Sequence, residues 1–500
     1  MSDRKPSLIM LGFDGATWSI INSLLEEGYL PNIRMIMDGG VYAKLLTPDP
    51  PYTPVIWTSI YTGAKQEKHG IKNFFNTSND IGVPRMWDIL LNEGMTAAVA
   101  GNYFTYPINE KLTFCIPSHF DAGEETRPER YSFLLKMTKE MGGLRKLRFG
   151  TLVKCGFSAL RNGLSIRSML LIARSILAVA FNRNVLNTYY RFQNIFMDTW
   201  FDVFLHAYKK TRPHFVSFYT PIPDTISHRY WSYHEPEKFD GLDANDIRKY
   251  RDVIRDTYRH CDRLIGRVLK KMSPDTQICI VSDHGFKAMD NPGGITWIIP
   301  EKLVNFLDLK GKLVITNLGH QLIFQPKSKE IMERVLKILQ EAIICERNAP
   351  VFRELDINRE TDTIKCTIAS GPLRRLDARV VIDGREIAIG KIARTASPWT
   401  GNHHVEDGVF ILSGPGVKDD GEKDMINAID IAPTLLRLQG IDITKCSDGK
   451  IRDDIIDEKW LEENSARTIE SYENIQFKPD HEVEAPEDEI AERLKSLGYM

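Results

Sequence analysis

Several absences limit what this chain of 500 residues can be. It has no uninterrupted apolar run of about 18 residues, the length that a membrane-spanning helix requires, so no spanning helix is expected. The N-terminus, MSDRKPSLIMLGFDGATW, leads into an apolar segment too short and too polar at its flanks for a secretory signal peptide. The seven cysteines are scattered and form no CxxC pair, which favours reduced thiols and a cytoplasmic location. A formal net charge of −2 argues against attraction of the whole protein to nucleic acid.

The tetrapeptide SDHG at 282–285 directly follows the apolar run QICIV and places a carboxylate and an imidazole at the end of a buried strand. This mixed set of ligands suits zinc first and manganese second. Further acids and histidines occur beside the apolar segments SLIMLGF, HFVSFYTPIP and GVFILSG. The residues in this pattern are Asp14, Asp224, His228, Asp283, His284 and His404. Their shared placement predicts one composite metal site.

Each of these residues also has an ordinary structural explanation. Asp14 and Gly15 suit a simple turn. Asp224 and His228 are four residues apart and suit a solvated pair on one helical face. The ordered set as a whole favours the metal site.

The chain alternates between strand-like and helix-like segments, which predicts a mainly parallel α/β sheet with helices on both faces. In such sheets, ligand sites lie beyond the carboxyl ends of the strands. Expected strands are Ile9–Phe13, Val41–Leu46, Thr96–Ala100, Phe215–Tyr219, Ile278–Val281 and Val409–Ser413. Expected helices are Trp18–Glu27, one starting at Pro31, Met86–Asn92, and a long one from about Ile247 to Lys271.

Two stretches interrupt the alternation and are interpreted as insertions that form a cap. The predicted organisation is a catalytic core at 1–121, 205–290 and 400–463, a basic helical insertion at 122–204, and a substrate insertion at 291–399. An acidic tail follows at 464–500, in which Ile490, Leu494 and Leu497 predict a docking helix.

Thr53 is the candidate nucleophile. It lies in PPYTPVIWTS, where the prolines predict the first turn of a helix. Exposed amides at a helix N-terminus attract a phosphate-like anion. A threonine hydroxyl needs a base or a metal ion to activate it, and an adjacent metal site would do so. An isolated Thr-Pro would be an ordinary helix cap.

The ordered motifs LGFDGA, PPYTPVIWTSIYTG, KHGI, PDTISH, VSDHGF, GNHHVEDG and IDIAPTLLRLQG carry a specific resemblance. With them the chain resembles the alkaline phosphatase superfamily, and more closely its type I phosphodiesterase/nucleotide pyrophosphatase branch with its phosphohydrolase or phosphomutase relatives. The resemblance implies an alkaline phosphatase-like fold and two divalent metal ions. One ion would be held by Asp224, His228 and His404, and the other by Asp14, Asp283, His284 and the Thr53 oxygen.

The chain departs from this branch at the phosphate-binding residues. Related phosphodiesterases carry an asparagine five residues after the histidine of HGI, where this chain has Phe74. Asn73 lies one position earlier and is the candidate substrate-binding residue. The four-residue step to Gly408 matches the H-x-x-x-G pattern of the family and selects His404, with His403 as the alternative ligand.

The predicted function is phosphoester hydrolysis in which Thr53 attacks phosphorus and water then hydrolyses the phosphothreonine. Two metal ions can stabilise both the entering and the leaving oxygen of such a displacement. One alternative is a phosphomutase or phosphotransferase, in which a second alcohol replaces water. Another is a non-catalytic module that binds polyanions or anionic membranes. A sulfatase is disfavoured, because its C/S-x-P-x-R motif has no counterpart around Thr53.

Residues 136–191 contain eleven lysines and arginines and a single acid, Glu140. The basic residues alternate with apolar segments such as SMLLIARSILAVAF. A solvated helical cap is the simpler interpretation. The functional interpretation is either a funnel for a polyanionic substrate or a surface for peripheral contact with an anionic membrane. Membrane contact would suit a lipid-linked substrate in place of a small phosphoester. No specific nucleic-acid motif is present, and the sequence does not indicate the oligomeric state.

Overall fold

A computed structural model describes residues 7–48, 51–121, 123–142, 159–181, 185–239, 242–289, 296–318, 321–358, 362–369, 373, 376–395, 400–404, 407–445, 447–472 and 475. The described residues fall into two compact units. Unit 1 comprises 1–227, 252–286 and 403–497, and unit 2 comprises 228–251, 287–402 and 498–500. The docking helix predicted around Ile490, Leu494 and Leu497 lies outside the described residues.

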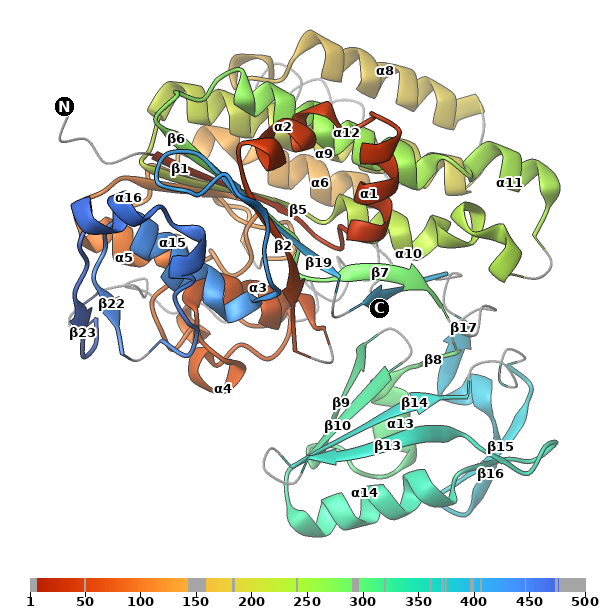
Figure 1. Ribbon diagram of the computed structural model, residues 1–500. Helices are drawn as coiled ribbons and strands as arrows, with labels where there is room; N and C mark the ends of the chain where they lie inside the picture. Colours follow the sequence, from red (N-terminus) through yellow and green to blue (C-terminus); the bar gives the residue numbers. More distant parts are fainter. Residues whose placement is uncertain are drawn as a thin grey trace. The chain divides into compact units, whose positions relative to one another are not determined.

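Unit 1 is built on a nine-stranded sheet in the order β20-β2-β19-β6-β1-β5-β3-β4, with β21 also pairing with β2. Strands β1, β5, β6, β3 and β4 pair in parallel, and β19 runs antiparallel to both of its neighbours. Helices cover both faces of the sheet (Figure 1). This confirms the predicted fold class. The strands are β1 (Ser7–Phe13), β2 (Gly40–Leu46), β3 (Ala97–Ala100), β4 (Phe114–Ile116), β5 (Phe215–Thr220), β6 (Thr276–Val281), β19 (Gly408–Ser413), β20 (Gly421–Glu422) and β21 (Ile426–Asn427).

The helices form two layers. On one face lie α1 (Trp18–Glu26), α2 (Pro31–Asp38), α6 (Phe133–Gly142), α8 (Ile166–Phe181), α9 (Val185–Thr211) and α12 (Val253–Leu269); on the other lie α3 (Thr53–Thr62), α5 (Met86–Asn92), α15 (Ile431–Leu438) and α16 (Glu458–Glu463). The short α4 (Gln66–His69) follows α3, and α10 (Ile222–His234) follows β5. The sheet core is mainly apolar, with buried polar residues such as Ser217 and Gln277, and β1, β5 and β6 are buried along almost their whole length.

The long helix predicted from about Ile247 to Lys271 is wrong. The segment forms two helices, α11 (Ala244–Tyr250) and α12, which are separated at Arg251 and Asp252. The reason is packing, because α11 buries only Tyr250 whereas α12 buries a full apolar stripe. The predicted boundary between the basic helical insertion (122–204) and the second part of the core (205–290) falls inside α9, which continues to Thr211.

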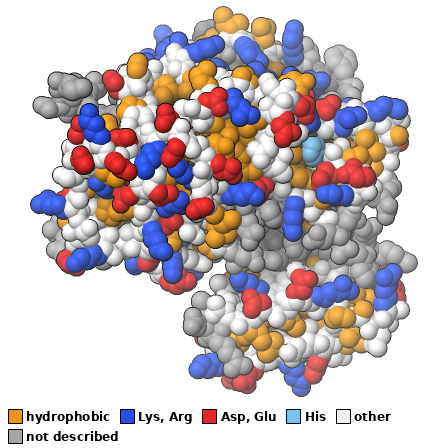
Figure 2. Space-filling view, viewed as in Figure 1, with side chains coloured by type: hydrophobic (Ala, Val, Ile, Leu, Met, Phe, Trp, Pro, Cys, Tyr) orange, Lys and Arg blue, Asp and Glu red, His pale blue; other side chains and the backbone are white. Residues whose placement is uncertain are grey.

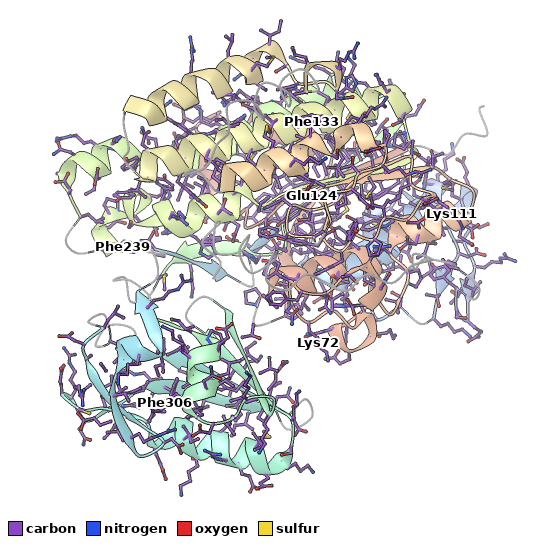
Figure 3. The ribbon with its side chains drawn as sticks, turned by 180° about the vertical axis from the view of Figure 1, so that it is seen from behind. Lys72, Lys111, Glu124, Phe133, Phe239 and Phe306 are labelled. Carbon is purple, nitrogen blue, oxygen red and sulfur yellow. The ribbon has the colours of Figure 1, made fainter. Side chains whose placement is uncertain are left out.

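Unit 2 has a hydrophobic core of its own, which includes Leu322, Phe324, Val335 and Ile364. It contains two four-stranded sheets, in the orders β13-β14-β10-β9 and β12-β11-β15-β16. Phe306 is labelled in Figure 3, and the Arg385 guanidinium lies 4.1 Å from its ring centroid. Besides α11, elements of unit 2 include α13 (Pro300–Phe306), α14 (Lys329–Glu341), β8 (Thr296–Ile298), β9 (Leu313–Leu318), β10 (Gln321–Pro326), β11 (Ile343–Ile344), β12 (Ala349–Pro350), β13 (Phe352–Asn358), β14 (Thr363–Ile368), β15 (Arg379–Ile382), β16 (Arg385–Ala388) and β17 (Ala393–Thr395).

No helix in the described ranges combines the length and the apolar character needed to cross a bilayer.

Candidate metal centre and active site

Three neighbouring parallel strands end at one edge of the unit 1 sheet. In the middle strand, β1, Gly12 pairs with Val281 of β6, and Phe13 pairs with Thr220 of β5. Asp14 follows β1 directly, and Asp283 follows β6 after a single serine. Asp224 lies in the first turn of α10, just beyond β5. The strand register therefore brings three acids from distant parts of the sequence to one place.

Gly15 allows the backbone segments that carry these acids to approach closely. Its φ is +65°, a left-handed conformation that favours glycine. A Cβ on Gly15 would lie 2.9 Å from both Cα and Cβ of Asp224 and 3.0 Å from the Phe286 ring. The Gly15 N–H also donates to Asp283 Oδ1 at 3.3 Å. The Asp14–Gly15 turn thus contacts the other two acidic segments.

The carboxylates surround the His284 imidazole. His284 Nε2 lies 3.4 Å from Asp14 Oδ1, 3.5 Å from Asp283 Oδ2 and 4.0 Å from Asp224 Oδ1. All four side chains are buried. One ligand atom each from Asp14, Asp224 and His284 lie within 4.8 Å of one another, a spacing at which they could share one ion.

Backbone carbonyls select the tautomers of two histidines. His284 Nδ1 donates to the Gly285 carbonyl at 3.0 Å, and His228 Nδ1 donates to the Gly401 carbonyl at 3.1 Å. In a neutral ring with the proton on Nδ1, the lone pair is on Nε2. This arrangement is the usual one for metal-binding histidines, whose other nitrogen donates to a carbonyl or carboxylate.

The three buried carboxylates carry like charges and repel one another. Burial raises the pKa of Asp14 well above its usual value, and the charges of Asp283 and Asp224 raise it further. Burial also raises the pKa of Asp283, to about 7. Crowded carboxylates of this kind favour a bound cation, which would compensate their charge.

The donor set fits a divalent metal ion. Among the described residues, the buried oxygens Asp14 Oδ1 and Asp283 Oδ2 accept no hydrogen bond. Buried acceptors without a hydrogen bond are unfavourable, and a cation would satisfy them. Carboxylate oxygens with imidazole nitrogens are ligands that zinc and manganese accept. The cluster is therefore a candidate metal centre.

The predicted nucleophile, Thr53, is the first residue of α3 and is almost fully buried. Trp57 lies one helical turn later, on the same face of α3. Its ring packs so tightly on Gly12 that a Cβ there would lie 2.6 Å from it. The Trp57 and Tyr219 ring centroids are 5.0 Å apart. This face of α3 is therefore packed on the strands β1 and β5, which lead to Asp14 and Asp224.

Two tyrosines that the sequence did not single out support the cluster. The Tyr219 hydroxyl donates to Asp14 Oδ2, and the Tyr103 and Tyr219 hydroxyl oxygens are 2.8 Å apart. Both rings are buried. Tyr219 belongs to β5, in which all six residues are buried, so no alternation in the sequence distinguishes a residue facing the site from a core residue.

The remaining predicted residues are placed as follows. Asn73 is half-buried in the loop after α4, and its Oδ1 accepts a hydrogen bond from the Phe75 N–H at 2.9 Å. Phe74 is buried and makes an edge contact with Tyr52, the residue before Thr53. His403 and His404 lie on β18 (Gly401–His404), and their side chains are outside the described part of the chain.

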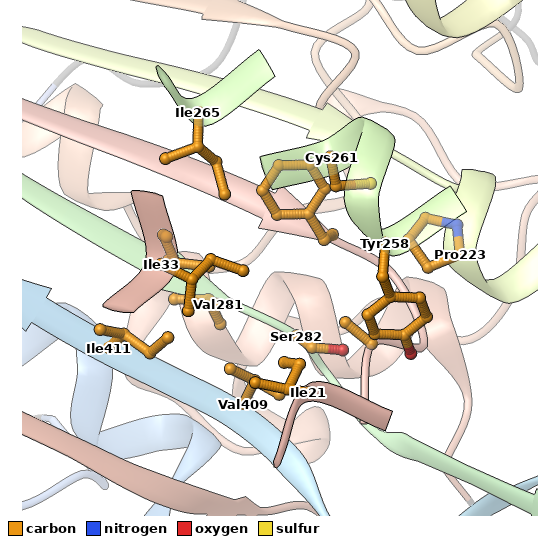
Figure 4. A pocket seen from close by; sticks show the side chains of 13 residues that line it. Ile21, Ile33, Pro223, Tyr258, Cys261, Ile265, Val281, Ser282, Val409 and Ile411 are labelled. Carbon is orange, nitrogen blue, oxygen red and sulfur yellow. The ribbon is translucent and has the colours of Figure 1, made fainter. Parts of the chain in front are cut away.

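An apolar pocket lies in the core of unit 1, on the face covered by α1, α2 and α12 (Figure 4). Phe13, Pro223 and Ser282, which line it, each precede one of the three acids. The other lining residues are Ala16, Ile21, Ile33, Tyr258, Cys261, Ile265, Ile280, Val281, Val409 and Ile411. The acid-bearing turns thus rest against an apolar region on this side.

The sequence and the fold match known proteins. The family model for type I phosphodiesterase / nucleotide pyrophosphatase matches residues 8–369, which include Asp14, Thr53, Asp224 and Asp283 but end before His404. A search of curated proteins finds no match.

Solved structures with a similar fold include human ectonucleotide pyrophosphatase / phosphodiesterase 5. It is 14% identical, covers 90% of this chain and 100% of its own, and has a TM-score of 0.51. An inactive murine form of that protein in complex with AMP is 14% identical, with coverages of 87% and 95% and a TM-score of 0.48. The human structure supports an alkaline phosphatase-like fold.

Proposed function

The chain belongs to the type I phosphodiesterase / nucleotide pyrophosphatase family and is a phosphoester-hydrolysing enzyme, and we propose that it uses Thr53 as nucleophile beside two divalent metal ions. The observation that carries this proposal is the buried cluster of Asp14, Asp224 and His284 at the ends of adjacent strands.

The proposed ligand sets extend the observed cluster. Asp14, Asp283, His284 and the Thr53 oxygen would hold one ion, and Asp224, His228 and His404 the other. When bound, the two ions would stabilise negative charge on the entering and leaving oxygens. Zinc is the first candidate because of the imidazole donors, and manganese is the second.

Thr53 would attack phosphorus and form a phosphothreonine, which water then hydrolyses. Its place at the N-terminus of α3 supports this role, because the backbone amides there attract a phosphate oxygen. Asn73 is the proposed contact to substrate. The substrate would be a soluble phosphodiester or nucleotide-like phosphoester, in keeping with the family name.

Substitution of Thr53 tests the proposal. Thr53→Ala should lower turnover of a chromogenic phosphodiester by about three orders of magnitude or more, because the hydroxyl forms the covalent bond. Thr53→Ser should keep part of the activity. Thr62→Ala is the matched control, since Thr62 lies at the other end of α3. Its hydroxyl donates to the Thr58 carbonyl and accepts from the Ala64 N–H.

Three further readouts separate the alternatives. Mass spectrometry of the Thr53 peptide after an acid quench should show a phosphate adduct. Full activity of the alanine variant would exclude the covalent step. Product that carries phosphate on an added alcohol would indicate a phosphotransferase. Protein that neither binds added zinc or manganese nor gains activity from them would indicate a non-catalytic module.

A further inference from the structure

Helix α8 presents an exposed face that combines large apolar and basic residues. Ile166 is 74% exposed and Leu170 is 57% exposed, although both are large aliphatic residues. They lie one turn apart, and the exposed Arg167 and Arg174 share their side of the helix. The helix contains no acidic residue. Adjoining aliphatic side chains on a surface indicate an interaction site more strongly than scattered ones.

The opposite side of α8 is fixed to the protein. Ser168 is buried, and its hydroxyl donates to Asp202 Oδ2 at 2.6 Å. The Ser165 N–H donates to the same oxygen at 2.8 Å. Asp202 also forms an ion pair with Arg267 of α12. These bonds set the rotation of the N-terminal half of α8, so Ile166 and Leu170 remain at the surface.

Exposed apolar and basic residues also occur in the segments next to α8 in the chain. Leu160 is 46% exposed, and Arg161 beside it is also exposed. Gly163 lies against α9, where a Cβ on it would be 2.2 Å from His206 Cβ. Burial lowers the pKa of His206, and the positive charges of Lys210, Arg130 and Lys209 lower it further. Figure 2 shows hydrophobic and basic side chains along the rim formed by α8.

We propose that this face of α8 docks on the surface of an anionic lipid bilayer. Ile166, Leu170 and Leu160 would enter the headgroup region, and the arginines would contact lipid phosphates while their aliphatic stems stay in the apolar layer. Charge complementarity selects this partner, because Arg167 and Arg174 lie beside the exposed Ile166 and Leu170 on a helix without acidic residues. A nucleic-acid surface would use the cations but would leave the exposed leucines and isoleucine in water. Attachment would be peripheral, through one face of α8 and the adjoining Leu160.

The side chains of Ile176, Leu177, Val179 and Arg183 lie outside the described residues, so the proposal rests on the residues from Leu160 to Arg174. It is independent of the proposed catalytic mechanism.

Co-sedimentation of the full chain with sucrose-loaded vesicles tests the proposal. Wild-type protein should bind vesicles of phosphatidylcholine mixed with phosphatidylglycerol at low salt, and binding should fall about tenfold or more at high salt or with phosphatidylcholine alone. The double variant Arg167→Glu with Arg174→Glu should lose binding to the anionic vesicles. Ile166→Ser with Leu170→Ser should weaken it at every salt concentration.

A matched control changes the net charge equally at another place. Arg248→Glu with Lys249→Glu alters two exposed cations of α11 and should leave binding unchanged. All variants should hydrolyse a soluble chromogenic phosphodiester like wild type, which separates a failure of docking from a failure of catalysis.

Three results would overturn the proposal: no binding to anionic vesicles at low salt, equal loss of binding in the α11 control, or unchanged binding in both α8 variants. Tighter binding to a single-stranded oligonucleotide than to vesicles, abolished by the arginine variants, would reassign the face to nucleic acid.

Discussion

The Tyr219 hydroxyl donates a hydrogen bond to Asp14 Oδ2, so a candidate metal ligand is oriented by a residue that makes no metal contact of its own in the proposed site. Tyr103 in turn lies within hydrogen-bond distance of Tyr219, with 2.8 Å between their oxygens. Partners of this kind hold a ligand in the orientation that a metal requires.

Tyr219→Phe should weaken zinc binding by about tenfold to a hundredfold, because Asp14 loses the bond that orients it. Affinity is measured by titrating metal-free protein with zinc against a chromophoric chelator. Tyr103→Phe keeps the bond from Tyr219 to Asp14 and should have a smaller effect. Wild-type affinity in the Tyr219 variant would show that the bond has no positioning role.

Gly15→Ala should destabilise the fold and lower the metal content. The new Cβ would lie 2.9 Å from backbone and side-chain atoms of Asp224, in addition to the strain of φ +65°. Gly28→Ala is the matched control, because Gly28 has a φ of +74° and no atom within 4 Å of the Cβ position. The control variant should lose only about 1–2 kcal/mol of stability, because of the left-handed conformation, and should retain metal. Urea unfolding and elemental analysis measure both effects, and equal losses in the two variants would contradict the close-contact argument.

Metal-free protein should become less stable as the pH rises from about 4 to 7. The pKa of Asp283 is raised to about 7 in the folded chain, whereas an unfolded aspartate has a pKa of about 3.9. The folded state therefore binds more protons in this window, and the free energy of unfolding falls with increasing pH. A bound cation favours the charged carboxylate, so the gain in Tm on adding metal should grow with pH.

Calorimetry of metal-free and metal-loaded protein across this window measures the effect. Asp283→Asn removes the titrating group and should flatten the pH dependence of the metal-free protein relative to wild type. Identical slopes in wild type and variant would mean that Asp283 does not titrate in this range.

His404→Ala should remove about one equivalent of metal and lower turnover by several orders of magnitude, and His403→Ala should be much milder. Successive residues of a strand point to opposite faces, so one of the two histidines is expected to serve as ligand, and the spacing to Gly408 selects His404. Metal analysis and turnover of both variants decide between them. The reverse ranking would assign the ligand to His403.

The sequence was informative where a pattern has a single physical cause. Apolar runs such as SLIMLGF and QICIV predicted β1 and β6, and the Thr-Pro pair predicted the start of α3 at Thr53. Strand ends also predicted that Asp14, Asp224 and Asp283 lie at one edge of the sheet.

Other features depend on contacts between distant residues. Nothing in the sequence near Tyr219 indicates that its hydroxyl meets Asp14, since the two residues are 205 positions apart. The role of Gly15 likewise depends on the approach of Asp224. The sequence pattern around Arg251 does not indicate the break between α11 and α12. The break accompanies a difference in burial, because α11 is mostly exposed whereas α12 packs on the core.

The pairing of β7 with β18 at the two ends of segment 289–400 has a consequence for protein engineering. β7 (Gly285–Ala288) and β18 pair with each other in a two-stranded sheet, and the chain between them, from 289 to 400, departs and returns through this ribbon. A short turn joining β7 to β18 would therefore excise most of that segment as a module. If Thr400 and Gly401 are retained, so are the backbone groups that hydrogen-bond to His228. Comparing the shortened chain with the full chain on a panel of phosphodiesters would show directly whether this segment affects substrate preference.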